Sequence, residues 1–128
     1  MKNIFKILKN ISIMIVEDDF LSTLFFQELF ENKVKRIFSE KTGEDAIETL
    51  KSNPEIEIIL LDIRLPGMNG LETIPFLKDI NPNTVIIAQT AYSLDNDRQD
   101  SLLAGCDDYI PKPVRSAELY DVILKHFN

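Results

Sequence analysis

Five short segments with strand character alternate along this sequence with segments whose apolar residues recur at helical spacing. The predicted strands are residues 11–16, 35–39, 56–61, 84–89 and 107–110, and the predicted helices begin near residues 20, 42, 71, 93 and 116. Continuous apolar strands such as ISIMIV are typical of a parallel sheet that is covered on both faces. This order therefore predicts an α/β fold with a five-stranded parallel sheet flanked by five helices and right-handed crossovers.

The chain has 128 residues, which is enough for one domain with its own core. Residues 1–10 are expected to form an N-terminal extension or linker, and residues 11–128 the domain itself. The formal net charge of −7 argues against nucleic acid as a direct partner, because phosphate binding needs basic patches. The same charge is compatible with a bound cation.

The sequence gives two indications of the compartment. Cys106 is the only cysteine, so an internal disulfide is excluded and a reducing environment fits. No apolar run approaches the roughly 20 residues that a membrane-spanning helix needs. Lys6 and Lys9 interrupt the apolar N-terminus, and Glu17 follows ISIMIV where a signal peptide would carry a small-residue cleavage site. We therefore expect a cytoplasmic protein without membrane insertion.

The helical patterns also predict which side chains face the core. The first predicted helix is expected to bury Leu21, Leu24, Phe25 and Leu29, and the last one Leu119, Val122, Ile123 and Phe127. The helix that starts near Ser93, its expected cap, is polar and has Leu94, Leu102 and Leu103 as its main apolar contacts. Such sparse anchoring predicts weak docking and easy displacement.

Charged and hydroxyl side chains follow four of the predicted strands. Glu17, Asp18 and Asp19 follow the first strand, Asp62 follows the third, Thr90 the fourth and Lys112 the fifth. Ligands of open α/β sheets bind at the carboxyl ends of the strands, so Asp18 and Asp62 converge if the first and third strands are neighbours. Clustered carboxylates repel each other unless a cation intervenes, and oxygen ligands favour Mg²⁺. A carboxylate such as Asp62 beside Mg²⁺, a hydroxyl and an ammonium is suited to forming an aspartyl phosphate.

Four segments carry a resemblance to a known family: IMIVEDD, LLDIRLPGMNG, IIAQTA and AGCDDYIPKP. In this order and spacing, across residues 11–128, they resemble the response-regulator receiver domains of two-component signalling. The resemblance implies a flavodoxin-like, doubly wound sheet of strand order 2-1-3-4-5. It also implies a phosphorelay function, in which a partner phosphohistidine donates a phosphoryl group to this chain in a magnesium-dependent reaction.

The resemblance assigns roles to individual residues. Asp62 resembles the phosphoacceptor and Lys112 the phosphate-binding lysine, while Thr90 resembles the switch hydroxyl and Tyr109 the aromatic that changes rotamer on activation. For Mg²⁺, Asp18 resembles the direct ligand, Glu17 a ligand through water, and Arg64 a ligand through its backbone carbonyl. The Lys112–Pro113 bond is expected to be cis by the same analogy.

The implied partners are a sensor histidine kinase or a histidine phosphotransfer protein. A downstream effector would bind the face formed by the fourth predicted helix, fifth strand and fifth helix, and dimerisation on phosphorylation is a further implied outcome. On this view the chain is a phosphoacceptor that assists its own phosphorylation and dephosphorylation, and not an enzyme with turnover. Whether it is free-standing or the receiver of a hybrid histidine kinase stays open.

Several alternatives remain for the function and for single residues. A phosphohydrolase resembling the haloacid dehalogenases would need a second acid two residues after its nucleophile, where this chain has Arg64. A receiver fold that is never phosphorylated would act only as an interaction module. Asp19 and Thr42 are expected to cap the starts of helices, and Gly105 the end of one. Gly67 and Gly70 are expected to shape a loop, and His126 to be a cation near a helix C-terminus. Arg64 is hypothesised to alter the lifetime of the phosphate.

Overall fold

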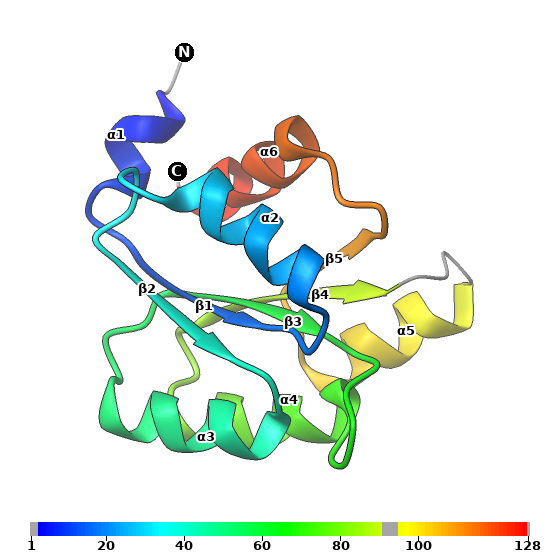
Figure 1. The fold of residues 1–128 in the computed structure, drawn as a ribbon. Coiled ribbons are helices and arrows are strands. Elements are labelled where there is room, and N and C mark those ends of the chain that lie inside the picture. The colour runs from blue at the N-terminus through cyan, green and yellow to red at the C-terminus, as the bar shows by residue number, and fades with distance from the viewer. Residues whose placement is uncertain (1–2, 91–94, 128) are drawn as a thin grey trace.

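The computed structural model describes residues 3–90 and 95–127, with the side chains of Thr90 and residues 95–98 excepted. Its strands form one five-stranded parallel sheet of order β2-β1-β3-β4-β5 (Figure 1). The strands are β1 (Ser12–Val16), β2 (Arg36–Glu40), β3 (Ile58–Asp62), β4 (Val85–Thr90) and β5 (Asp108–Pro111). The helices within the described residues are α1 (Ile4–Leu8), α2 (Phe20–Phe30), α3 (Gly43–Ser52), α4 (Gly70–Ile80), α5 (Asp95–Ala104) and α6 (Ser116–His126). The predicted doubly wound fold and its strand order are confirmed.

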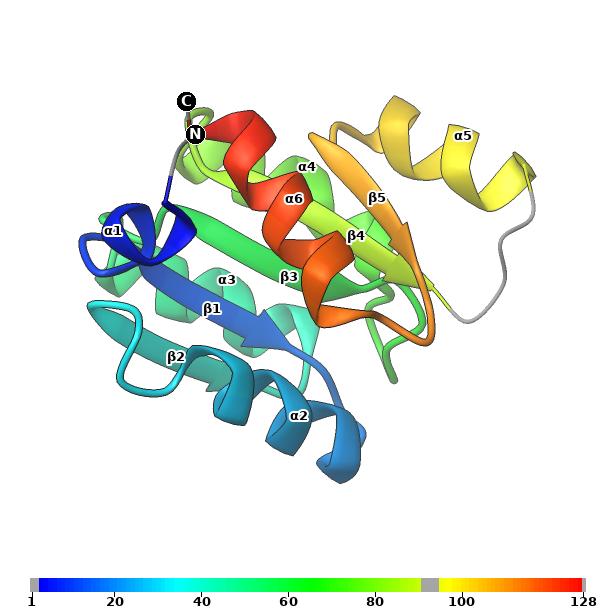
Figure 2. The same cartoon turned by 90° about the horizontal axis from the view of Figure 1, so that it is seen from above.

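Helices cover both faces of the sheet, so the strands are buried on both sides. Helices α1, α2 and α6 lie on one face, and α3, α4 and α5 on the other (Figures 1 and 2). Successive strand side chains point to opposite faces. Ile13 and Ile15 accordingly pack with α2 and α6, whereas Met14 and Val16 pack with α3 and α4. Residues along one strand thus belong to two separate apolar clusters, which hold the sheet rigid from both sides.

The N-terminal segment was expected to be an extension or linker, without regular structure of its own being predicted. In the structure it forms the helix α1. Asn3 caps α1 by accepting a hydrogen bond from the backbone N–H of Phe5 at 2.9 Å. Leu8 is fully buried in the cluster beneath α2 and α6, and the Phe5 ring packs edge-on against Tyr120 with 5.8 Å between the ring centroids. Helix α1 therefore contributes to the core that lies on this face of the sheet.

The predicted inner face of α2 is largely wrong. Phe26 and Phe30 are the buried residues of this helix, and Leu29 packs partly against them. In contrast, Leu21 is 72% exposed, and both Leu24 and Phe25 are 40% exposed. The sequence FLSTLFFQELF is apolar on almost every side of the helix, so its periodicity could not select the buried face.

The predicted anchors of α5 are also wrong. Leu102 is 46% exposed and Leu103 is 86% exposed, while Ser101 is fully buried and Ala104 is half-buried against the core. Small side chains let this helix approach closely beside α4 and β5. Gly105 ends the helix with a φ of +112°, as its predicted capping role requires. Ser93 and Leu94 lie outside the described residues.

Other local predictions hold. Thr42 caps α3 by accepting from the backbone N–H of Asp45 at 3.1 Å. Leu119 and Ile123 are buried on the inner side of α6, with Val122 and Phe127 partly buried beside them, and the Lys112–Pro113 peptide is cis. Among the residues that the structure describes, each helix is too short or too polar to cross a bilayer.

Truncation of Leu8 tests whether α1 belongs to the folded core. We expect Leu8→Ala to lower the free energy of unfolding by about 2 to 5 kcal/mol, because a fully buried leucine would be replaced by a cavity. Urea denaturation followed by circular dichroism measures this change. The matched control is the neighbouring exposed Lys9→Ala, and equal stability of the two variants would contradict the packing of α1.

Candidate functional site

The strand order places the side chains that follow β1, β3 and β5 at one end of the sheet. In the β1–β3 pair Val16 lies opposite Leu61, so the next residues, Glu17 and Asp62, are adjacent. Asp62 is the last residue of β3, and Lys112 directly follows β5. Parallel strands all end on the same edge, which is why residues distant in sequence meet here.

Lys112 joins two of the acidic residues. Its Nζ lies 3.0 Å from Oδ2 of Asp62 and 3.2 Å from Oε1 of Glu17. The Glu17 side chain is fully buried, that of Asp62 is 6% exposed, and that of Lys112 is 24% exposed. Two buried carboxylates thus share one ammonium, whose positive charge reduces their mutual repulsion.

The turn after β3 fixes the second oxygen of Asp62. Its Oδ1 accepts a hydrogen bond from the backbone N–H of Arg64 at 2.9 Å. Gly70, at the start of α4, lies so close to this turn that a Cβ atom would collide with the backbone of Ile63 and Asp62. Gly67 has a φ of +69° in the same loop, a conformation that favours glycine. Both glycines therefore shape the loop, as predicted, and the Asp62 carboxylate is held at both oxygens.

Three carboxylates form a group that could hold a metal ion. Oxygens of Glu17, Asp18 and Asp62 all lie within 4.8 Å of one another, and Asp18 is exposed, so the group opens to solvent. Within the described residues, Lys112 is the cation that contacts this group, and it leaves negative charge uncompensated. An all-oxygen set with excess negative charge fits a hard divalent cation such as Mg²⁺.

Burial and crowding change the protonation of the site. Burial, followed by the hydrogen bond and repulsion from Asp62, raises the pKa of Glu17 from its ordinary value of 4.5 to about 7. Burial lowers the pKa of Lys112, but its hydrogen bond and attraction to Asp62, with help from Glu17, outweigh this effect and raise it. Lys112 therefore stays charged, whereas Glu17 takes up a proton near neutral pH when no other cation is present.

Asp19 lies outside this group and caps α2, as predicted. Its Oδ2 accepts hydrogen bonds from the backbone N–H and the hydroxyl of Ser22, both at 2.9 Å. These hydrogen bonds lower the pKa of Asp19. The acidic run after β1 is therefore divided: Glu17 and Asp18 face the site, and Asp19 starts the helix.

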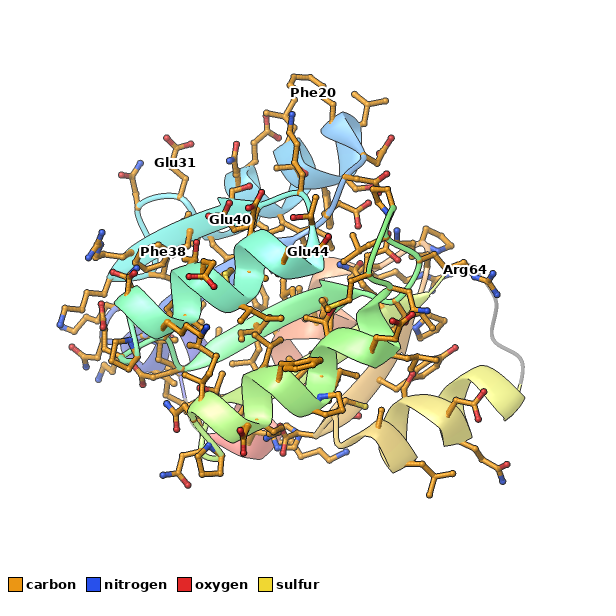
Figure 3. All side chains as sticks on the ribbon, turned by 90° about the horizontal axis from the view of Figure 1, so that it is seen from below. Phe20, Glu31, Phe38, Glu40, Glu44 and Arg64 are labelled. Carbon is orange, nitrogen blue, oxygen red and sulfur yellow. The ribbon has the colours of Figure 1, made fainter. Side chains whose placement is uncertain are left out.

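The remaining predicted residues lie around the site. Thr90 ends β4 and pairs with Pro111, next to Lys112, but its side chain is outside the described atoms. Tyr109 is half-buried on β5. The exposed Arg64 side chain points outward from the loop after β3 (Figure 3). His126, in the last turn of α6, lies with its Nε2 2.9 Å from Oδ2 of Asp108, so it has a specific carboxylate partner besides its place at the helix end.

Sequence reasoning missed Gln89, which lines a groove beside the site. The groove has a volume of about 650 Å³ and lies between α2 and the segment after β5. Its lining comprises Leu21, Ser22, Phe25, Phe26, Gln89, Lys112, Pro113 and Val114. The available signal was a polar residue directly after the apolar run VIIA of β4.

This arrangement is suited to accepting a phosphoryl group. The Asp62 carboxylate is held at both oxygens and could act as a nucleophile, and Lys112 places positive charge beside it. Exposed Arg64 occupies the position where a phosphohydrolase of the haloacid dehalogenase type would need its second acid. The geometry therefore favours formation of an aspartyl phosphate over rapid hydrolysis by a second carboxyl group.

Comparisons with known proteins agree with this geometry. The family model of the response regulator receiver domain matches residues 13–124. The polar-differentiation response regulator DivK of Brucella ovis is 32% identical over 114 residues, which cover 88% of this chain and 92% of that protein.

Two solved structures extend the comparison. One is from the co-crystal structure of the Saccharomyces cerevisiae histidine phosphotransfer signaling protein Ypd1 and the receiver domain of its downstream response regulator Ssk1. The match has a TM-score of 0.86 and 25% identity, covering 94% of this chain and 90% of that one. The other is the receiver domain of sensor histidine kinase PA1611 from Pseudomonas aeruginosa PAO1, with a magnesium ion in the active site cleft. It has a TM-score of 0.81 and 26% identity, covering 92% of this chain and 98% of that one.

The raised pKa of Glu17 predicts how the stability of the metal-free protein depends on pH. Between about pH 4.5 and 7 the folded state holds a proton on Glu17 that the unfolded state has lost. Stability falls with rising pH wherever the folded state binds more protons. The comparison is made in EDTA, which removes metal ions. We expect the free energy of unfolding of the wild type minus that of Glu17→Gln to decrease as the pH rises through this window.

Urea denaturation at a series of pH values measures the difference between the two proteins. The gain in free energy of unfolding that Mg²⁺ gives the wild type is expected to grow with pH over the same window. The reason is that a carboxylate must be deprotonated before it can bind the metal. A difference that stays constant with pH would contradict the burial of a protonatable Glu17.

Proposed function

The chain belongs to the response-regulator receiver domain family, and from this premise we propose that Asp62 is its phosphoacceptor in a two-component phosphorelay. The observation that carries the proposal is the contact of Lys112 with both Asp62 and Glu17 at the carboxyl end of the sheet. A buried aspartate that is oriented by an ammonium and a backbone N–H has the geometry of a positioned nucleophile.

The transfer takes place between a phosphohistidine of the partner and Asp62. A carboxylate oxygen of Asp62 forms a bond to phosphorus, and the phosphorus–nitrogen bond breaks. The imidazole departs with the electron pair of that bond and takes up a proton. Lys112 remains next to the phosphorylated carboxyl group and balances the charge on the phosphoryl oxygens, which is the main requirement in phosphoryl transfer.

The carboxylates of Glu17, Asp18 and Asp62, with the backbone carbonyl of Arg64, hold Mg²⁺ in this proposal. Support comes from the clustering of the three carboxylates and from the magnesium ion of the PA1611 receiver domain. When bound, Mg²⁺ neutralises the acidic group and withdraws charge from the phosphoryl oxygens. Asp18, which is exposed, would bind the ion directly, and buried Glu17 would bind it through water, as the resemblance to the family implies.

Phosphorylation changes the surface that an effector recognises. Thr90 moves toward the phosphate and Tyr109 turns inward, which shifts a pre-existing equilibrium between two conformations. The responding face consists of α5, β5 and α6. Leu102 and Leu103, exposed on α5, give this face an apolar contact surface. This face serves an effector or a second phosphorylated copy of the chain.

The phosphodonor is a sensor histidine kinase or a histidine phosphotransfer protein. The Ypd1–Ssk1 complex supports this class of partner, because it pairs a phosphotransfer protein with a receiver domain similar to this chain. The domain assists its own phosphorylation and dephosphorylation but does not turn over a substrate. The cytoplasm is its proposed compartment, consistent with Cys106, whose thiol is buried and whose pKa burial raises to about 11.

Incubation with acetyl phosphate and Mg²⁺ tests the phosphoacceptor. We expect intact-protein mass spectrometry to show the gain of one phosphoryl group in the wild type, loss of this gain in EDTA, and no gain in Asp62→Asn. Asp19→Asn is the matched control, because Asp19 lies nearby but only caps α2. Labelling of Asp62→Asn would exclude Asp62 as acceptor. Continuous release of phosphate from many substrates would instead indicate a hydrolase, and an unlabelled wild type an interaction module.

Substitution of Arg64 tests its proposed effect on the lifetime of the phosphate. The exposed side chain stands beside the turn that holds Asp62, where it hinders attack by water on the aspartyl phosphate. We expect Arg64→Ala to lose phosphate several-fold faster than the wild type after removal of the donor. Arg64→Met keeps most of the bulk without the charge and separates the two causes. Equal rates in Arg64→Ala and the wild type would end the hypothesis.

A further inference from the structure

One buried side chain beside the phosphoacceptor has hydrogen-bonding groups that the proposed transfer does not use. Gln89 is 1% exposed, and both its Nε2 and its Oε1 are buried without a hydrogen-bond partner in the described part of the chain. Most buried polar atoms in proteins have a partner, because burial takes away their hydrogen bonds to water. An amide that stays unpaired therefore destabilises the conformation in which it occurs.

The register of the sheet places Gln89 next to Asp62. Strand β4 lies between β3 and β5, and Gln89 pairs with Asp62 on one side and with Ile110 on the other (Figure 2). Residues that pair in register on neighbouring parallel strands lie about 5 Å apart and point to the same face. The preceding pair of this alternation, Leu60 and Ile87, packs in the cluster beneath α2 and α6. Gln89 and Asp62 therefore point to that face side by side.

The side chain of Lys112 passes over the same position. Lys112 follows β5, yet its Nζ lies 3.0 Å from Oδ2 of Asp62 on β3, so its side chain crosses the intervening strand β4. Gln89 and Lys112 also line the same groove between α2 and the segment after β5. Because neighbouring strands lie about 4.8 Å apart, a side chain as long as glutamine reaches groups on the next strand. Its terminal torsion is soft, so the carboxamide can turn toward either group.

Asp62 and Lys112 offer the acceptor and the donor that the carboxamide lacks. A carboxylate has about four lone-pair sites, and the described contacts give Asp62 one donor at each oxygen, from Arg64 and from Lys112. An ammonium has three N–H donors, and the contacts of Lys112 with Asp62 and Glu17 use two of them. Nε2 of Gln89 can thus donate to the Asp62 carboxyl group while Oε1 accepts from Lys112.

We propose that Gln89 is a positioning residue of the phosphoacceptor site, whose carboxamide pairs with Lys112 and Asp62 when Asp62 carries a phosphoryl group. The inference rests on the proposed phosphoryl transfer to Asp62. Before transfer, Lys112 contacts the Asp62 carboxylate itself. After transfer, its ammonium turns to the phosphoryl oxygens, where most of the negative charge then lies. Nε2 of Gln89 takes its place on the carboxyl oxygen, and Oε1 accepts from the ammonium and holds it toward the phosphoryl group.

This pairing biases the domain toward its phosphorylated form. In the unphosphorylated protein the unpaired amide raises the free energy of the folded state, and in the phosphorylated protein two new hydrogen bonds remove that cost. A group that is paired in only one of two states shifts the equilibrium between them toward that state. Gln89 thereby favours retention of the phosphoryl group without contacting phosphorus itself.

Nuclear magnetic resonance of the carboxamide tests the pairing directly. In protein labelled with nitrogen-15, the Nε2–H signals of Gln89 are those that are absent from the spectrum of Gln89→Met. We expect a downfield shift of these signals when acetyl phosphate and Mg²⁺ are added, because hydrogen bonding deshields the donated proton. The signals of Gln27, which lines a separate groove beside Ile37 of β2, are the internal control and should stay in place. In Asp62→Asn the Gln89 signals should not move either.

Labelling by acetyl phosphate tests the bias. Methionine has about the length of glutamine but lacks its hydrogen-bonding groups. We expect Gln89→Met to need about tenfold more acetyl phosphate than the wild type for half labelling in Mg²⁺, because its phosphorylated form loses hydrogen bonds to charged groups. Without acetyl phosphate, the urea midpoint of this variant should equal or exceed that of the wild type, because an unpaired amide is removed. Gln27→Met is the matched control and should match the wild type in both measurements.

Three results would overturn the inference and leave the phosphoacceptor role of Asp62 intact. The first is that the Gln89 signals stay in place while acetyl phosphate labels the wild type, as expected if a water molecule pairs the amide in both states. The second is equal labelling of Gln89→Met and the wild type. The third is a lower urea midpoint of the unphosphorylated variant, which would show that the amide is already paired. Failure of acetyl phosphate to label Asp62 would instead refute the proposed function, and the inference with it.

Discussion

The ion pairs of Lys112 with Asp62 and Glu17 are the interactions on which the rest of the site depends. They hold two buried carboxylates together at the end of a parallel sheet, where repulsion would otherwise separate them or leave both protonated. One ammonium does not neutralise three clustered acids, and burial, together with the hydrogen bond and repulsion from Asp62, raises the pKa of Glu17 to about 7. The site is therefore organised but short of positive charge, which suits a divalent cation. With such a cation bound, the site could also balance the negative charge of a phosphoryl group.

Lys112 also lies between the groove beside α2 and the proposed effector face. It lines the groove under α2 on one side, and on the other it directly follows β5, which lies between α5 and α6 in the proposed effector face (Figure 2). Both surfaces carry exposed apolar side chains, on α2 and on α5 respectively. A domain that receives a phosphoryl group on one side and presents a changed surface on the other needs a rigid sheet between them, and the two apolar clusters provide it.

Prediction from sequence succeeded for the strands and for the inner face of α6 but failed for the faces of α2 and α5, and the reason is physical. A strand buried on both faces needs only a continuous apolar run, which β1 and β3 have. A helix must choose one face, and α2 is apolar nearly all round, so only its packing shows that Phe26 faces the core and Leu21 does not. On α5 the core contact is made by Ser101, because close approach favoured a small side chain over the neighbouring leucines.

The sequence by itself determined the alternation of strands and helices, the acidic, hydroxyl and basic residues at the strand ends, and the caps at Asp19 and Thr42. These are local properties, set by the spacing of apolar residues and by hydrogen bonds within one turn of helix. Only the tertiary structure decided that Lys112 bridges Glu17 and Asp62, that α1 joins the core, and that Gln89 is buried without a hydrogen-bond partner among the described residues. Those facts depend on which segments become neighbours in space, and neighbours are chosen by the packing of the whole chain.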